Sequence, residues 1–373
     1  MSKIRLAHFP QPAHKAKREI TVMSNSTPSG WKRRGFIGSA LVASGAALGW
    51  VVRRFQAPES APAAAARKRD NQFAYDVSEF ETTDPALLRY EPAGEFATGM
   101  AQPKRLAIWP GRGVIVAGDR SLKLFDDAGT LRNEWPLEQS AHCLHVAGPD
   151  ELMVGLGNRI ECFDSTGRMR TAFRSLGSKT YLTSLAVQGD RIFAADAGNR
   201  EVIIADRQTG EVRQRFGKKD AGLGNPGFNV PSPYFALALA PDQRLRIVNP
   251  GLLRVETYTL DGRFVSAWGK PGMQINHFCG CCNPVYFALT RAGDFVTSEK
   301  GLARINLYTA DGAFKGAVAG PETLVADKEL AKQACHDCSV GAGFDVAIAD
   351  NGDVFALDPY RHNVRRFRPK DPS

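Results

Sequence analysis

The chain has 373 residues, of which 43% are hydrophobic and 23% are charged, and its formal net charge is +9. The positive charge is confined to one end. Residues 1–69 contain 13 lysines and arginines and two acidic residues, so residues 70–373 carry a net charge of −2. A nucleic-acid-binding domain needs a basic surface, so we expect no nucleic-acid partner. The remaining 304 residues are enough for one large domain with a substantial core.

The basic segment resembles a twin-arginine export signal. The sequence "WKRRGFIGS" contains Arg33, Arg34 and Phe36, and an apolar run of 17 residues from Phe36 to Val52 follows. In such signals the paired arginines are read by the export receptor as an address. The resemblance implies a periplasmic or membrane-anchored protein whose folded part lies outside the cytoplasm. A plain signal anchor is the alternative. The apolar run of 17 residues is at the lower limit of the length that can span a bilayer.

Cleavage of this segment is left open by the sequence. Small residues at 61–66 match a cleavage site, but they lie far from the end of the apolar run. An uncleaved anchor that holds the protein to the membrane is the alternative, and translation could start at Met1 or Met23. We interpret residues 1–69 as an export signal or anchor with an Ala/Pro-rich linker, and residues 70–373 as the folded domain.

The folded domain contains six copies of one pattern, in which a turn with acidic residues or glycine joins two apolar strands. The copies begin at Leu106, Leu144, Leu185, Leu237, Phe287 and Val346. Most continue into a third strand, a turn such as "YTLDGRF" or "YTADGAF", and a short fourth strand. Glycine in these turns supplies the positive φ that tight hairpins need. Four-stranded repeats without intervening helices predict an all-β fold, a propeller of six blades.

The last repeat has no fourth strand of its own. An unmatched copy of that strand, "LLRYEPAGEF", stands before the first repeat at residues 87–96. We therefore expect the N-terminal segment to complete the last blade, which removes free sheet edges. A seventh, degenerate blade formed from "FAYDVSEFETTDP" at residues 73–85 is the alternative.

The "LAxxxxGxxFxxD" cores and "xxDGxF" turns resemble the NHL-repeat group of six-bladed β-propellers, over roughly residues 87–370. The resemblance implies the ring fold and, we expect, a monomer. It does not select a function, because such propellers include binding modules, metal-dependent lyases and lactonases.

Five of the seven cysteines fall in two short clusters, "HFCGCCNP" and "ACHDCSVG". They are Cys279, Cys281, Cys282, Cys335 and Cys338. In a propeller the crossover loops between blades line one face around the central channel. The two clusters lie in the crossovers that enter blades 5 and 6. The fold is therefore expected to bring both to the same face, within bonding reach of one another.

Three interpretations of the clusters remain open. Four thiolates in one pocket can hold zinc or an iron–sulfur cluster, with His277 and His336 as further ligands or as hydrogen-bond partners of the ligands. In an oxidising compartment the same cysteines can form structural disulfides that tie the long loops together. A redox-active dithiol is the third interpretation.

Other residues give weaker signals. His142 stands at the crossover into blade 2, either as a hydrogen-bonded loop residue or as a ligand on the same face. Asp345 and Tyr286 occupy the position of Cys143 in their own blades and should point toward the channel. Cys143 and Cys162 are expected to be buried thiols that pack as small apolar residues. The stretch "SEKGLAR", residues 298–304, is interpreted as a solvated charged turn.

Two functions from different classes are consistent with these features. We favour an exported binding or scaffold protein whose cysteine site is a structural or electron-transfer centre, with an unidentified protein or small molecule as its ligand. The alternative is a lyase or lactonase at the channel mouth, in which His142, His277, His336 and Asp345 act as metal ligands or bases. The sequence shows no nucleophile elbow, phosphate loop or zinc-protease motif, and no Cys-x-x-Cys-His motif for covalent haem.

Overall fold

The structure of the protein is a computed structural model that describes residues 78–325 and 343–370. The chain divides into two units, Met1–Asp70 and Asn71–Ser373, and all described residues belong to the second. The proposed export segment, including Arg33, Arg34 and Phe36, lies outside the described residues. Within the described part of the chain, no helix has the length and apolar character needed to cross a membrane.

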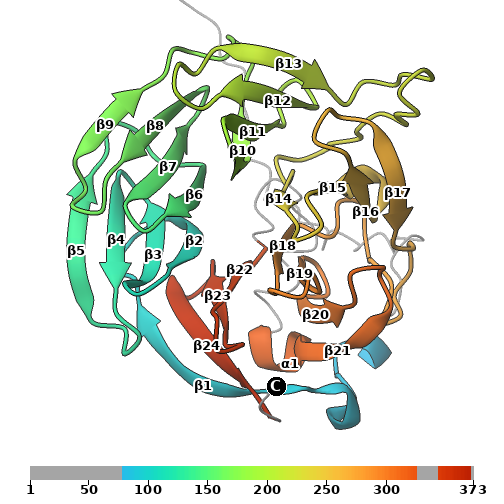
Figure 1. Cartoon of the computed structure of the whole chain (residues 1–373). Helices are drawn as coiled ribbons and strands as arrows, with labels where there is room; N and C mark the ends of the chain where they lie inside the picture. Colours follow the sequence, from blue (N-terminus) through green and yellow to red (C-terminus); the bar gives the residue numbers. More distant parts are fainter. Residues whose placement is uncertain (1–77, 326–342, 371–373) are drawn as a thin grey trace, which may run out of the picture. The chain divides into compact units, whose positions relative to one another are not determined.

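Six antiparallel sheets of four strands each form a propeller ring (Figure 1). Blade 1 contains β2 (Pro103–Trp109), β3 (Gly113–Gly118), β4 (Ser121–Phe125) and β5 (Leu131–Pro136), and blade 2 contains β6 (Cys143–Gly148), β7 (Glu151–Leu156), β8 (Arg159–Phe163) and β9 (Met169–Ala172). Blade 3 contains β10 (Leu182–Gln188), β11 (Arg191–Asp196), β12 (Glu201–Asp206) and β13 (Val212–Phe216), and blade 4 contains β14 (Leu237–Leu239), β15 (Leu245–Asn249), β16 (Arg254–Tyr258) and β17 (Phe264–Trp268).

Blade 5 contains β18 (Tyr286–Leu289), β19 (Phe295–Glu299), β20 (Arg304–Tyr308) and β21 (Phe314–Ala319). Blade 6 combines β22 (Asp345–Ile348), β23 (Val354–Asp358) and β24 (Asn363–Pro369) with the N-terminal strand β1 (Tyr90–Ala97). The short helices of the described chain are η1 (Ser78–Phe80), η2 (Pro85–Leu87), η3 (Pro250–Leu252) and α1 (Pro321–Leu324). The expected all-β propeller of six blades is thus confirmed.

The N-terminal segment closes the ring, as the sequence predicts. Strand β1 pairs antiparallel with β24 along its length, from Tyr90 opposite Pro369 to Ala97 opposite Asn363. Just before β1, Leu88 forms a parallel bridge with Ala317 of β21, so the same segment also contacts blade 5. The alternative of a seventh blade finds no support, because the described residues form six sheets and each has four strands.

A repeated contact between neighbouring blades explains why the turn glycines are needed. At five places an aromatic side chain from the outer edge of one blade packs on a turn glycine of the next, where a Cβ atom would have no room. The pairs are Phe96 with Gly129, Trp135 with Gly167, Phe173 with Gly210, Phe216 with Gly262, and Trp268 with Gly312. All five glycines have positive φ, which a residue with a Cβ atom rarely adopts.

Candidate functional site

The innermost strands converge on one arginine at the centre of the ring. Arg105 of β2 is buried, and its Nη2 donates a 3.0 Å hydrogen bond to the carbonyl of Thr183 in β10. Its guanidinium lies 4.3 Å from the ring centroid of Tyr286 in β18, and its Nη1 lies 3.6 Å from the carboxylate of Asp345 in β22. Arg105 therefore connects blades 1, 3, 5 and 6 across the channel.

Asp345 and Tyr286 both act as partners of this cation. The Asp345 carboxylate also accepts a 2.8 Å hydrogen bond from the backbone amide of Leu106. Burial raises the pKa of Asp345, and the nearby Arg105 opposes that effect. Since Arg105 and the Leu106 amide already engage the carboxylate, Asp345 is poorly placed to serve as a metal ligand. Arg105 gave no signal in the sequence, because it stands inside the apolar strand "PKRLAIW".

His142 lies at the entry to blade 2, next to this central group. Its Nδ1 is 2.7 Å from the hydroxyl of Tyr181, and the two rings meet edge to face at 4.6 Å. Burial and the positive charges of Lys104 and Arg105 lower the pKa of His142 to about 4. The imidazole is therefore neutral near pH 7, so one of its ring nitrogens donates a hydrogen bond and the other accepts one.

The crossover into blade 5, residues 269–285, is called the cysteine loop because it contains Cys279, Cys281 and Cys282. A buried ion pair of blade 5 holds this loop. Arg304 and Glu299 lie 2.9 Å apart, with side-chain exposures of 3% and 0%. Glu299 accepts a 3.0 Å hydrogen bond from the backbone amide of Cys279. The interpretation of residues 298–304 as a solvated charged turn is wrong, because the loop folds over these charges.

Arg304 also binds the loop through its backbone carbonyls. Its Nη1 donates to the carbonyls of Met273 and Gln274 at 2.9 and 3.2 Å, and its Nη2 donates to that of His277 at 3.1 Å. The planar guanidinium carries five donors, so one side chain can fix several turns of an irregular loop. The same arrangement explains why a Glu and an Arg five residues apart are buried here.

Asn283 fixes the other end of the loop. Its side-chain amide donates to the carbonyls of Cys279 and Lys300, at 2.5 and 2.9 Å, and accepts a 3.0 Å hydrogen bond from the Lys300 amide. Asn283 is 1% exposed. The backbone of the three-cysteine segment is therefore set by buried polar contacts on both sides.

Cys282 of the cysteine loop lies near Ser232, in the crossover into blade 4, and near Lys300, in the turn after β19. Its side chain is buried, and its Sγ is 3.3 Å from Sγ of the neighbouring Cys281. Burial raises the pKa of the Cys282 thiol, but the nearby polar groups of Ser232, Lys300 and Cys281 outweigh that effect, and the pKa lies below its ordinary value. The Lys300 ammonium also lies 4.9 Å from the ring centroid of Tyr234. This environment favours the thiolate form, which is the form that binds metals.

The other predicted ligands are placed less favourably or fall outside the described residues. The imidazole of His277 packs against Gly272, where an added Cβ would lie 2.5 Å from Nδ1. Cys335, His336 and Cys338 lie outside the described residues, so the meeting of the two cysteine clusters stays a prediction. Among residues 78–325 and 343–370, no three His, Cys, Asp or Glu side chains are grouped as a metal site.

Cys143 and Cys162 lie in the core, as the sequence predicts. Both pack in one apolar cluster between blades 2 and 3 with residues such as Met153 and Leu182. Burial raises the pKa of each thiol to about 12. They are therefore inert thiols, in contrast to Cys282 in the loop.

The fold and this face define the protein as a six-bladed β-propeller with a cysteine-bearing crossover loop. No protein-family model matches the sequence, and no curated protein matches it. A solved streptogramin B lyase structure is similar with a TM-score of 0.51 at 10% identity, over 77% of this chain and 100% of that chain. A structural genomics protein of unknown function from Bacteroides thetaiotaomicron has a TM-score of 0.48 at 13% identity, over 75% and 73% of the two chains. Similarity at this identity shows the fold alone.

Proposed function

We propose that the protein is an exported binding protein that carries a cysteine-ligated metal ion or iron–sulfur cluster on its crossover face. The observation that supports this proposal most is the construction of the cysteine loop. Glu299, Arg304 and Asn283 fix its backbone from beneath, and the loop presents Cys281 and Cys282 with their sulfurs side by side. A loop held so firmly is a prepared ligand site, since ordering it on metal binding costs little.

The donor set fits a soft metal centre. Thiolates are the ligands that zinc and iron–sulfur clusters take most often in proteins. Cys279, Cys281 and Cys282 would supply ligands from the described loop, and Cys335 and Cys338 would supply those from the neighbouring crossover. Ser232 and Lys300 lie near Cys282, and polar groups close to ligand sulfurs adjust the reduction potential of a cluster. A bound cluster would supply one-electron transfer, whereas zinc would supply a structural cross-link.

Metal and sulfide analysis of the full chain, purified without oxygen, tests this function. We expect stoichiometric zinc, or iron with sulfide, and its loss in Cys282→Ser and Cys338→Ser. The matched control is Cys162→Ala, which removes a buried thiol outside the loop and should retain the metal. A metal-free protein whose loop cysteines are all in disulfides would refute the proposal and favour a structural role.

The export part of the proposal rests on the resemblance of the N-terminal segment to a twin-arginine signal. Replacing Arg33 and Arg34 by lysine should prevent a fused reporter from reaching the periplasm. The same replacement at Arg53 and Arg54, which follow the apolar run, is the control and should leave export intact. Equal export of both variants would argue for a different route.

An enzyme at the channel mouth is the second candidate, and the neutral His142 beside Tyr181 is the observation in its favour. A neutral imidazole next to a hydroxyl can act in general acid–base catalysis. The candidate ranks lower because Arg105 engages Asp345 and Gly272 packs against His277. Activity on a panel of lyase and lactone substrates that disappears in His142→Gln would reverse this ranking.

A further inference from the structure

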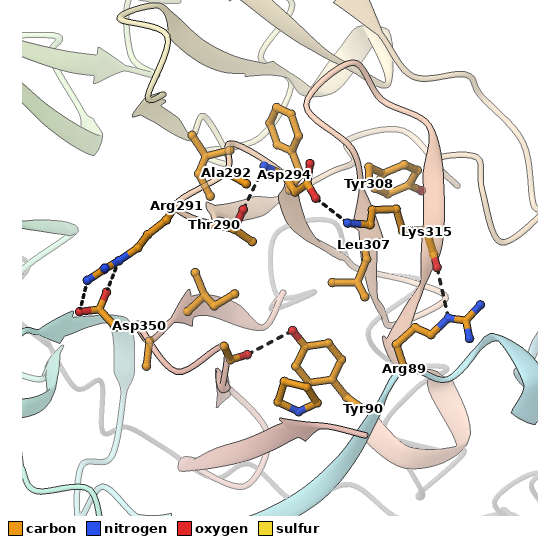
Figure 2. Close-up of a pocket in the computed structure, with 16 residues that line it drawn as sticks. Arg89, Tyr90, Thr290, Arg291, Ala292, Asp294, Leu307, Tyr308, Lys315 and Asp350 are labelled. Carbon is orange, nitrogen blue, oxygen red and sulfur yellow. Dashed lines mark hydrogen bonds and ion pairs between the residues drawn. The ribbon is translucent and has the colours of Figure 1, made fainter. Parts of the chain in front are cut away.

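A second site lies between blades 5 and 6, away from the cysteine loop. A cavity of about 590 Å³ opens where β18 and β22 end, at Leu289 and Ile348. Those strands begin at Tyr286 and Asp345, which contact Arg105, so the cavity opens toward the opposite side of the ring from the crossover face. We call it the seam pocket. Figure 2 shows its lining residues.

The ring is closed in a different way at this boundary between blades. In blade 4, Trp268 of β17 pairs with Val255, the second residue of β16. In blade 5 the equivalent position is Ala319 of β21, which pairs with Ile305, the second residue of β20. Blade 6 also lacks the turn glycine that would receive an aromatic ring, because β24 and β1 are distant in sequence. Arg89 and Tyr90 cross the gap instead. Ring closure therefore brings two residues of the N-terminal segment, Arg89 and Tyr90, into the lining of the pocket.

The lining combines an apolar interior with polar edges. Leu289, Leu307, Ile348 and Pro369 contribute aliphatic surface, and the Tyr90 hydroxyl donates a 3.1 Å hydrogen bond to the Gly352 carbonyl at one edge. The volume lies within the range of about 300–1,000 Å³ that is typical of small-molecule pockets. Its shape and lining suit a compact ligand with an apolar body.

The charges at the edges favour an anion. Among the described lining residues, three are cationic and two are carboxylates. Both carboxylates are already paired, Asp350 with Arg291 and Asp294 with Lys315, each at 2.6 Å. Arg89 has no carboxylate partner among the described residues, and its Nε donates a 3.4 Å hydrogen bond to the Lys315 carbonyl. The Arg291–Asp350 and Asp294–Lys315 pairs lie on two different sides of the pocket in Figure 2.

We propose that the seam pocket binds a small amphipathic anion, a molecule with an apolar aromatic or aliphatic body and one carboxylate or sulfonate group. The apolar body would lie against Leu307 and Ile348, and the anionic group would lie near Arg89. This site is independent of the cysteine loop and of any metal bound there.

Fluorescence titration of the full chain with 1-anilinonaphthalene-8-sulfonate tests the proposal. We expect saturable binding at one site. Arg89→Gln should weaken it by about 3- to 5-fold, the size of an exposed charge interaction. Ala292→Trp, in the exposed turn at the pocket edge, should block it. Arg112→Gln, in the groove between blades 6 and 1, is the matched control and should bind as the parent does.

An uncharged analogue, N-phenyl-1-naphthylamine, separates the charge from the apolar contribution. Its affinity should not change in Arg89→Gln, although Ala292→Trp should still block it. Circular dichroism of each variant checks that the fold is intact. Equal sulfonate binding by the parent, Arg89→Gln and Ala292→Trp would overturn the proposal, and so would the absence of saturable binding to the parent.

Discussion

Replacing Arg304 by leucine tests whether the buried ion pair holds the cysteine loop. The change leaves the Glu299 carboxylate in a fully buried position without its cation. It also removes the donors to the carbonyls of Met273, Gln274 and His277. Breaking a buried pair by removing one partner costs about 3–5 kcal/mol. For a domain of about 300 residues that corresponds to a fall in Tm of roughly 5–8 °C.

The loss should depend on pH in a direction that the structure defines. Burial raises the pKa of Glu299, and Arg304 opposes that effect. Without Arg304 the folded-state pKa rises further above the unfolded value. A protonated Glu299 carries no charge, so stability is retained below the unfolded pKa and is lost as the pH rises through the folded pKa. The Tm deficit of Arg304→Leu should therefore be larger at pH 8 than at pH 5.

Thermal unfolding followed by circular dichroism measures these effects. Glu299→Gln/Arg304→Leu should recover at least half of the lost Tm, because no uncompensated charge is left. Arg291→Leu is the control, since Arg291 and Asp350 have side-chain exposures of 79% and 63% and should change Tm by no more than about 2 °C. A fall of less than about 3 °C in Arg304→Leu, or a double variant no better than the single one, would refute the reasoning.

Three further predictions concern the fold. Burial and Arg207 lower the pKa of His145 to about 4 from 6.5, so the unfolded state binds more protons between these values and stability falls as the pH drops. Urea unfolding should show that His145→Gln removes about 2 kcal/mol of the difference between pH 7 and pH 4.5. Gly312→Ala should destabilise by about 2–4 kcal/mol because Trp268 occupies the Cβ position, whereas Gly293→Ala, with similar φ but with the nearest side-chain atom 3.6 Å from the added Cβ, should cost about 1 kcal/mol; equal losses would contradict the packing argument. Deleting β1 should expose the edge of β24 and cause aggregation in size-exclusion chromatography, and a soluble monomer would show that ring closure is dispensable.

The sequence predicts the fold well because its signals are local and repeated. Each blade carries its own strand pattern, and blades 1 to 5 also carry the turn glycine, as at Gly262 and Gly312; these signals follow from short-range chemistry. The closing role of residues 87–96 could be deduced because one repeat lacked a strand and one strand lacked a repeat. Both signals can be recognised in the sequence without any knowledge of contacts between distant residues.

The candidate site was less predictable because it depends on contacts between blades. Arg105 stands in an apolar strand, and its partners Thr183, Tyr286 and Asp345 come from three other blades. Residues 298–304 have the composition of a solvated turn. Only the structure shows that the cysteine loop covers them. The role of Lys300 beside Cys282 could likewise be seen only in three dimensions.

X-ray absorption spectroscopy of the full chain, purified without oxygen, tests the central claim most directly. The account predicts a metal edge with sulfur neighbours at about 2.3 Å, and fewer sulfur neighbours or no metal in Cys282→Ser. The Cys162→Ala variant should give the spectrum of the parent. A metal surrounded by nitrogen and oxygen alone, or a spectrum unchanged by Cys282→Ser, would contradict the assignment of the cysteine loop as a metal ligand site.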